Sequence, residues 1–263
     1  MARFAVGLPL CLLCVSSLFA QNPPASDPQA LSFVAQSIAA MTQGAAITDV
    51  TITGNATWIA GSDHETGQLT LRAKGYAESR IDFNLSSGTH SDIRNDNGGL
   101  PQGAVIRADG SLRPLPLHNC WINASWFFPA SSFLSVTSDP TLIFSYVGQE
   151  NHEGTSVQHL RVSRYLTGQR TSEIALTQRI SSMEIYLDSL SLLPRAFVFN
   201  THPDDDANTD ISLEIDFSNY QLVSGVQAPL HIQKLVSGGL ALDIVVTSAA
   251  LNSGLPDILF AIQ

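Results

Sequence analysis

Apolar and polar residues alternate along most of the chain after residue 47. Ile52, Ala56 and Trp58 are separated by Thr, Gly and Asn, and Leu69 and Leu71 continue the pattern. A period of two gives each strand one apolar and one polar face, which is typical of an antiparallel sheet buried on one face. Further runs of this kind cover 81–85, 142–146, 157–165, 183–187, 197–199, 211–217 and 240–246.

Turn residues separate several of these runs. The stretch 61–67 begins and ends with glycine and contains Ser, Asp, His, Glu and Thr, so we expect a hairpin loop there. Asp109-Gly110 lies between two short alternating runs and predicts a two-residue turn.

Three segments have a helical pattern instead. Asp27-Pro28 predicts an N-cap followed by the first helical residue, and Gly44 a C-terminal stop. Between them the apolar residues recur at spacings of three and four. A second segment, about 115–136, is rich in aromatic residues and is interrupted by Pro129, and a third covers 171–181. The stripe of the first helix consists of Leu31, Val34, Ile38 and Met41.

These elements predict an α+β fold with one long, curved antiparallel sheet covered by two or three helices. We find no repeat and no linker strong enough to divide the chain. We therefore expect a single domain over 27–263, with the helical segment at about 115–136 as an insertion.

Composition narrows the class of protein. The 263 residues are 44% hydrophobic and 14% charged, with a formal net charge of -10. The apolar content is enough for a packed core, so the chain is not disordered as a whole. Lys74 and Lys234 are its two lysines. An acidic chain with so few cations has no basic face for nucleic acid, and we expect no such partner.

The first 20 residues are typical of a secretory signal peptide. Arg3 supplies a positive charge, an uncharged apolar run extends to Phe19, and Ala20 precedes the helix-breaking residues 21–24. We expect cleavage after Ala20 and a short linker over 21–26; an uncleaved anchor is the alternative. The sequence has no other apolar run long enough to span a bilayer.

Export would leave one cysteine, Cys120, because Cys11 and Cys14 lie in the leader. No intrachain disulfide is then possible, which favours a bacterial periplasm or exterior over a disulfide-rich extracellular module. We expect Cys120 to be a small buried apolar side chain instead of a nucleophile.

The string His202-Pro203-Asp204-Asp205-Asp206 is the strongest candidate for metal chemistry. It is similar to an element of LmbE-like zinc deacetylases, but only His231 follows it and the surrounding pattern is antiparallel. The alternate oxygen side chains also resemble half of a calcium loop, without the glycine and glutamate that such a loop needs. We favour a solvated loop over either metal and expect no cofactor. The weak calcium candidates are Asp204, Asp206, Asn208 and Asp210.

Local catalytic motifs are absent from the sequence. We find no G-x-S-x-G, no phosphate-binding P-loop and no H-E-x-x-H. This favours a protein that is not an enzyme, although a triad assembled from distant residues stays open.

An aromatic cluster within 115–136 is the candidate binding feature. Two interpretations use the same residues: a core helix that fills one side of the sheet, or a cover over an apolar groove. The cluster consists of Trp121, Trp126, Phe127, Phe128 and Phe133.

The chain also resembles a known family. The similar strings in its first half are Gly67-x-Leu69-x-Leu71-Arg72-x-Lys74 and Arg80-Ile81-Asp82. The second half has Leu187-Asp188, Leu193-Pro194, the run 217–220 (Phe-Ser-Asn-Tyr), Gly225-Val226 and Pro229. Together with the secretion signal and the first helix, these resemble the bacterial outer-membrane lipoprotein carrier (LolA/LolB-like) superfamily and its secreted relatives. The chain departs from the carriers at Gly75, at 95–103 and in the aromatic insertion.

The resemblance implies an open half-barrel: a strongly curved antiparallel sheet with an apolar concave face. Such a face suits an acyl chain, since each buried methylene gains about 0.8 kcal/mol. Our leading hypothesis is a non-enzymatic exported or periplasmic protein that binds a lipid or lipoprotein. The alternatives are a structural or interaction domain with a dry core and a secreted hydrolase with non-local catalytic residues.

We predict that export removes the leader between Ala20 and Gln21. Intact-mass spectrometry of the exported protein tests this, and we expect a chain that begins at Gln21. Membrane-bound protein that retains Met1 would contradict the assignment.

Overall fold

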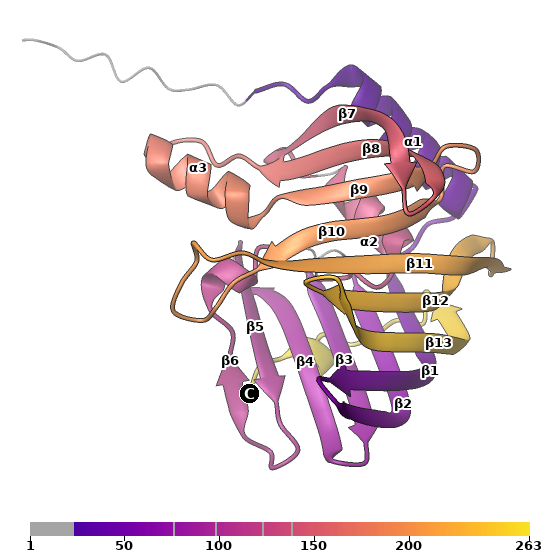
Figure 1. The fold of residues 1–263 in the computed structure, drawn as a ribbon, viewed down its shortest axis with the longest axis vertical. Coiled ribbons are helices and arrows are strands. Elements are labelled where there is room, and N and C mark those ends of the chain that lie inside the picture. Colours follow the sequence, from indigo (N-terminus) through magenta and orange to yellow (C-terminus); the bar gives the residue numbers. More distant parts are fainter. Residues whose placement is uncertain (1–23, 76, 98, 123, 138) are drawn as a thin grey trace, which may run out of the picture.

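A single antiparallel sheet dominates the computed structural model, which describes residues 24–263 except 76, 98, 123 and 138 (Figure 1). The leader predicted over 1–20 lies outside these residues. Within the described part, the strand order is β6-β5-β4-β3-β2-β1-β13-β12-β11-β10-β9-β8-β7. The strands are β1 Asp49–Ala60, β2 Asp63–Lys74, β3 Glu78–Leu85, β4 Gly88–Asn97, β5 Leu100–Ile106, β6 Leu112–Pro114, β7 Leu142–His152, β8 Thr155–Arg164, β9 Met183–Asp188, β10 Pro194–Thr201, β11 Ile211–Val223, β12 Val226–Val236 and β13 Gly239–Leu251. The helices are α1 Pro28–Thr42, α2 Pro129–Val136 and α3 Thr171–Ile180, with short 3₁₀ turns η1 Leu117–Asn119 and η2 Asp257–Phe260.

The sheet has two arms that meet at a central seam. Strand β1 pairs with β13 from Val50 opposite Leu251 to Trp58 opposite Leu242. One arm runs from β1 to β6 and the other from β13 back to β7, so β6 and β7 are the free edges. Because β6 precedes β7 in the chain, the segment 115–141 must cross from one edge to the other. We call it the crossing segment.

Small residues let the sheet bend beside this seam. The ladder between β1 and β13 shifts register at Gly54, where an added Cβ would lie 2.5 Å from the Val245 carbonyl oxygen. On β2, a Cβ at Gly67 would lie 2.1 Å from the Asn84 carbonyl oxygen. Glycine is therefore required at both places, where neighbouring backbone approaches too closely for any side chain.

The inner, concave face of the sheet carries the core. Cross-strand pairs place Ile52 beside Leu71, and Ile215 beside Phe197, and all four are buried. Helix α1 packs against β7, β12 and α2 on this face. Figure 1 shows α3 at the opposite end of β8 and β9 from α1. The predicted α+β fold with a strongly curved sheet, not closed and accompanied by three helices, is confirmed among the described residues.

Helix α1 begins as predicted and buries most of the predicted stripe. Asp27 is its N-cap and accepts a hydrogen bond from the Gln29 N–H at 2.7 Å, with Pro28 as the first helical residue. Val34 and Met41 are buried, whereas Leu31 is 42% exposed, so its place in the predicted stripe is wrong. The small residues Ala30 and Ser37 take the buried positions instead, because they let the helix approach the sheet closely.

The crossing segment is only partly helical. A short 3₁₀ turn covers Leu117–Asn119, and α2 begins at Pro129. The described residues between them form turns, so the helix predicted over about 115–136 is correct only at its C-terminal end. Proline is tolerated in the first turn of a helix but not inside one, which explains the boundary.

Two predicted turns had different outcomes. The loop expected over 61–67 is wrong, because β2 already begins at Asp63 and only Gly61-Ser62 connect the strands. Polar residues 63–67 resemble a loop because both faces of this end of β2 reach solvent. The turn at Asp109-Gly110 is confirmed between β5 and β6.

The connection between β10 and β11 is anchored more firmly than a solvated loop. His202 is only 3% exposed, contrary to the surface position that we expected. Buried Asn119 of the crossing segment holds this residue: its Nδ2 donates to the His202 carbonyl at 2.8 Å, and its Oδ1 accepts from the His202 N–H at 2.9 Å. Arg179 of α3 donates to the carbonyl oxygens of Ala207 and Asn208 farther along the loop.

No helix within the described residues is long and apolar enough to cross a membrane. The domain boundaries, with one domain over 27–263, stay a prediction.

We predict that Asn119→Ala destabilises the fold by about 2–3 kcal/mol, because it leaves buried backbone groups of His202 without partners. Chemical denaturation measures the change. The control Asn84→Ala, at an exposed strand position, should stay within about 0.5 kcal/mol of wild type. Equal effects of the two variants would contradict the anchoring role.

Candidate functional site

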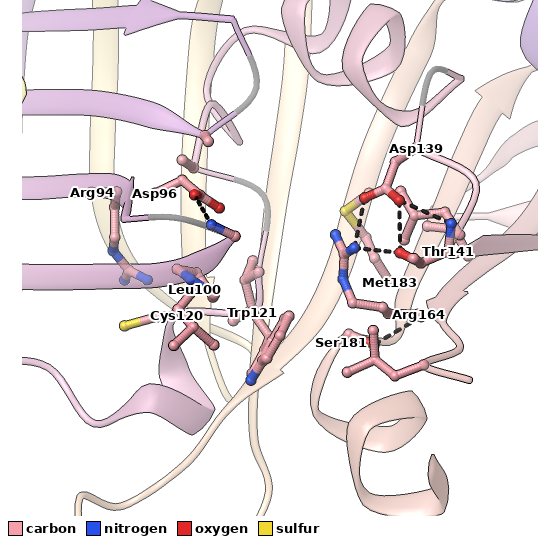
Figure 2. A pocket seen from close by; sticks show the side chains of 18 of the residues that line it. Arg94, Asp96, Leu100, Cys120, Trp121, Asp139, Thr141, Arg164, Ser181 and Met183 are labelled. Atoms are coloured by element: carbon pink, nitrogen blue, oxygen red, sulfur yellow. Dashed lines mark hydrogen bonds and ion pairs between the residues drawn. The ribbon is translucent and has the colours of Figure 1, made fainter. Parts of the chain in front are cut away.

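A cavity of about 450 Å³ lies where the two arms of the half-barrel approach one another. One wall comes from β4 and β5, the other from β8, β9 and the start of β7, and the crossing segment lies between them. Figure 2 shows Arg94, Leu100 and Cys120 on one side of this gap, with Arg164 and Met183 on the other. The apolar lining residues include Leu100, Trp121, Ile122, Leu142, Val162, Leu166, Met183 and Phe199.

The sheet register explains why distant residues meet here. Val162 on β8 pairs with Met183 on β9, which in turn pairs with Phe199 on β10. Since cross-strand partners face the same side of a sheet, their side chains form one apolar row on the inner face. Trp121 approaches this wall from the crossing segment.

An ion pair forms the polar border of this wall. An Nη of Arg164 lies 2.6 Å from Oδ2 of Asp139, and the Thr141 hydroxyl donates to the same carboxylate at 2.7 Å. Burial raises the pKa of Asp139, but the hydrogen bonds from Thr141 and Arg164 outweigh it and hold this pKa below its ordinary value. The Arg164 guanidinium carbon lies 5.5 Å from the centroid of the Trp121 ring, a cation–π contact. The charge of Arg164 is thus already matched.

Cys120 is an unreactive part of the lining. Its side chain is buried, and its thiol donates to the Pro116 carbonyl at 3.4 Å. Burial raises the pKa of this thiol, so it stays protonated near neutral pH.

The structure divides the predicted aromatic cover into two groups. Phe127, Phe128 and Phe133 are fully buried, and Phe133 contacts Phe197 edge to face at 5.9 Å. Trp121 and Trp126 are only partly buried, and of these two Trp121 lines the cavity. The three phenylalanines therefore belong to the core, and Trp121 faces the space between the arms.

The oxygen side chains proposed as weak calcium ligands turn to separate partners. Asp204 pairs with Arg113 at 2.6 Å, and Asp210 pairs with Arg179. Asp206 accepts hydrogen bonds from the Asn208 N–H and the Thr209 hydroxyl within its own loop. The structure therefore does not gather these carboxylates around a common point.

A different polar cluster lies on the outer face of the sheet. His152 bonds to Glu214 at 2.7 Å and stacks on Tyr186, with ring centroids 3.9 Å apart. His159 stacks on the same Tyr186 at 4.4 Å. One ligand atom from each of His152, Glu214 and Asp216 lies within 4.8 Å of the others, so within the described chain these three could hold a metal. Burial and the neighbouring Glu214 raise the pKa of Asp216 to about 6.

Sequence reasoning did not find most of these residues. Arg94, Asp139, Arg164 and Met183 come from four separate segments and carry no shared motif. The alternation places Met183 on a buried face, but not beside a cavity. Of the five aromatic residues predicted as a cover, Trp121 is the one that lines this cavity.

Comparison with known proteins identifies the fold. No protein-family profile and no curated protein matches the sequence. A solved outer membrane lipoprotein-sorting protein domain from Vibrio parahaemolyticus is similar, with 12% identity, a TM-score of 0.56, and coverage of 88% of this chain and 96% of that one. A DUF1329 family protein from Desulfovibrio piger has 14% identity, a TM-score of 0.56, and coverage of 90% and 98%. A LolA superfamily protein from Nitrosomonas europaea has 10% identity, a TM-score of 0.51, and coverage of 89% and 97%.

At these identities the likeness shows the fold alone. The chain has the LolA-like open half-barrel, so the resemblance predicted from its sequence is confirmed at the level of the fold.

We predict that Asp216→Asn stabilises the protein at pH 8 by about 1–2 kcal/mol, with the gain fading towards pH 4. A raised carboxyl pKa means that stability is present while the group is protonated and is lost as pH rises through about 6. Asn imitates the protonated form and cannot ionise in the unfolded chain, so its advantage grows as pH rises from the ordinary value of 3.8 to about 6 and is small at pH 4. Denaturant unfolding at the two pH values measures it.

The exposed Asp205→Asn serves as the control and should have little effect at either pH. A pH-independent effect of Asp216→Asn would contradict the assignment.

Proposed function

We propose that this protein is an exported, non-enzymatic binding protein for the acyl chain of a lipid or lipidated partner. The observation that carries the proposal is the cavity of about 450 Å³ between the arms, with its row of apolar side chains. Ligand sites commonly have volumes of about 300–1,000 Å³ and are lined mainly by apolar groups with a few polar ones at the border.

The lining chemistry suits a flexible hydrocarbon chain. Leu142, Val162 and Phe199 offer aliphatic and aromatic surface, and Met183 adds a side chain that adapts to an irregular ligand. The Arg164–Asp139 pair next to them is already neutralised. An acyl chain would therefore bury its methylenes without leaving this pair uncompensated.

The crossing segment would supply the entrance. Phe127, Phe128 and Phe133 hold its second half in the core, whereas Trp121 lies outside that packed group. Asn119 and the phenylalanines fix the segment on both sides of Trp121, so opening would require mainly the partly buried Trp121 side chain to move, which costs less free energy than displacing a core helix. We therefore assign the role of movable cover to Trp121, with the phenylalanines as its anchors.

The similar solved structures support this general direction. One of them is described as an outer membrane lipoprotein-sorting protein domain, and another belongs to the LolA superfamily. With the leader predicted over 1–20, they favour a periplasmic or secreted protein.

The hydrolase alternative would need a nucleophile beside a cleft. Nδ1 of His231 shares a hydrogen bond with the Ser218 hydroxyl at 3.1 Å, and Nε2 of His231 shares one with Oδ1 of Asp243 at 2.7 Å. Serine, histidine and aspartate are linked in the same order in a catalytic triad. The outer face of β11, β12 and β13 carries this chain of bonds, and neither Ser218 nor His231 lines the described cavities. Asp243 lines a second described cavity, but Ser218 and His231 line none, so we favour binding over hydrolysis. An interaction domain with a dry core is the other alternative.

We predict that Trp121→Ala weakens binding of a fluorescent fatty-acyl probe about tenfold, equivalent to about 1.4 kcal/mol. The exposed Leu190→Ala should bind as wild type does. Titration of probe fluorescence measures the affinities, and denaturant melts measure stability.

Trp121→Ala should also cost less stability than Phe128→Ala, for which we expect about 3–5 kcal/mol as for a ring truncated in a closed core. The absence of saturable probe binding to wild type would contradict the proposed lipid binding and favour the interaction domain with a dry core.

A further inference from the structure

Lys234 points into the half-barrel although it is charged. On β12 it pairs with Ile215 on one side and Leu242 on the other, and both of these are buried in the core. Partners across strands share a face, so the lysine side chain leaves the sheet on the inner, apolar side. The other lysine of the chain, Lys74, pairs with Asp257 near the C-terminus.

The ammonium group of Lys234 forms no ion pair within the described part of the chain. Its Nζ lies 5.3 Å from the centroid of the partly buried Trp126 ring, and it has no hydrogen bond or ion pair with any residue in the described ranges. Burial lowers the pKa of Lys234. A cation held in apolar surroundings without a partner is costly and gains from any anion brought to it.

The charged residues near Lys234 do not neutralise its positive charge. Asp92 and Arg94 both act electrostatically on Lys234 from β4. Asp92 is already shared with Arg94, whose Nε lies 3.4 Å from Oδ1, and Arg94 donates to the Asn119 carbonyl at 2.6 Å. One carboxylate therefore serves two cations, in contrast to the one-to-one pair of Arg164 and Asp139.

Arg94 connects this excess charge to the binding cavity. It lines the cavity of about 450 Å³ together with Trp121, Met183 and Phe199. Trp126, which lies against Lys234, belongs to the same crossing segment as Trp121. Lys234 itself does not line the cavity, but Arg94, which acts electrostatically on it, does. A ligand whose hydrocarbon end occupies the apolar row would thus meet Arg94 directly and feel the charge of Lys234.

We infer that the ligand is an acidic single-chain amphiphile whose anionic head group is bound by Arg94 at the cavity wall and attracted by the unpaired ammonium group of Lys234. The inference rests on the proposed function and narrows it from acyl chains in general to lipids with a carboxylate or phosphate group. An ionic hydrogen bond in such a poorly solvated place is stronger than the same bond in water.

A competition assay separates the head group from the chain. The neutral probe is a pyrene-labelled fatty acid methyl ester bound to the full-length exported protein. Dodecanoate, dodecyl phosphate and dodecanol displace it, and they share one chain length. We expect wild type to bind at least one of the two anions tenfold or more tightly than dodecanol; comparison of the two anions identifies carboxylate or phosphate as the head group.

Variants at the two lysines locate the effect. Lys234→Met keeps the length of the side chain without its charge, and we expect it to lose the preference for anions while its affinity for dodecanol stays within about twofold. Lys234→Arg keeps the positive charge and should retain the preference for anions. It controls for a folding defect caused by any change at this position. The matched control Lys74→Met should behave as wild type does.

The outcomes distinguish the two levels of the hypothesis. Equal affinity of wild type for dodecanol and both anions would overturn the head-group inference and leave acyl-chain binding intact. Retention of the anion preference in a folded Lys234→Met variant would also overturn it. If no dodecyl compound displaces the probe and the probe itself does not bind, the proposed function fails.

Discussion

The pairing of β1 with β13 is the contact on which the rest of the structure depends. It joins strands from opposite ends of the described chain, so its formation requires closure of a very long loop. Once it exists, hairpin connections extend both arms outward and leave β6 and β7 as free edges. The crossing segment then has to span the opening between those edges. The cavity lies there because the seam and the strand order together leave that region to be closed by irregular chain.

The interior of the half-barrel has a tightly packed part and an open part. Helix α1 and the three buried phenylalanines of the crossing segment fill the inner face, while Trp121 and the apolar row on β8–β10 border open space. Charges follow the same division. Arg164 and Asp139 neutralise each other at the cavity border, whereas Lys234 projects from an apolar surface and forms no ion pair among the described residues. An unpaired lysine that faces the core does not stabilise the fold, which favours a role in binding.

Much of the fold could be predicted because it depends on local patterns. Period-two alternation identifies strands such as β11, and Asp27-Pro28 identifies the start of α1. Predictions failed where tertiary contacts decide the outcome. Leu31 fits a helical stripe but lies outside the contact with the sheet, and polar Asp63–Gly67 look like a loop because both faces of that strand end reach solvent. His202 is buried only because Asn119, far away in sequence, bonds to its backbone.

The candidate site was less predictable for the same reason. Trp121 could be selected as a large aromatic residue in an unusual segment, but the walls it faces come from strands whose proximity depends on sheet curvature. The inward direction of Lys234 could have been found from alternation along β12, since it lies two residues beyond Ile232. A lysine at such a position is easily taken for the end of a strand.

Native mass spectrometry of the exported protein tests the central claim most directly, because it detects a bound chain without a choice of probe. We expect a population carrying the added mass of one acyl compound, released on collisional activation and replaced when excess fatty acid is supplied. Protein that shows only its own mass, both as purified and after incubation with fatty acid, would contradict a lipid-binding cavity.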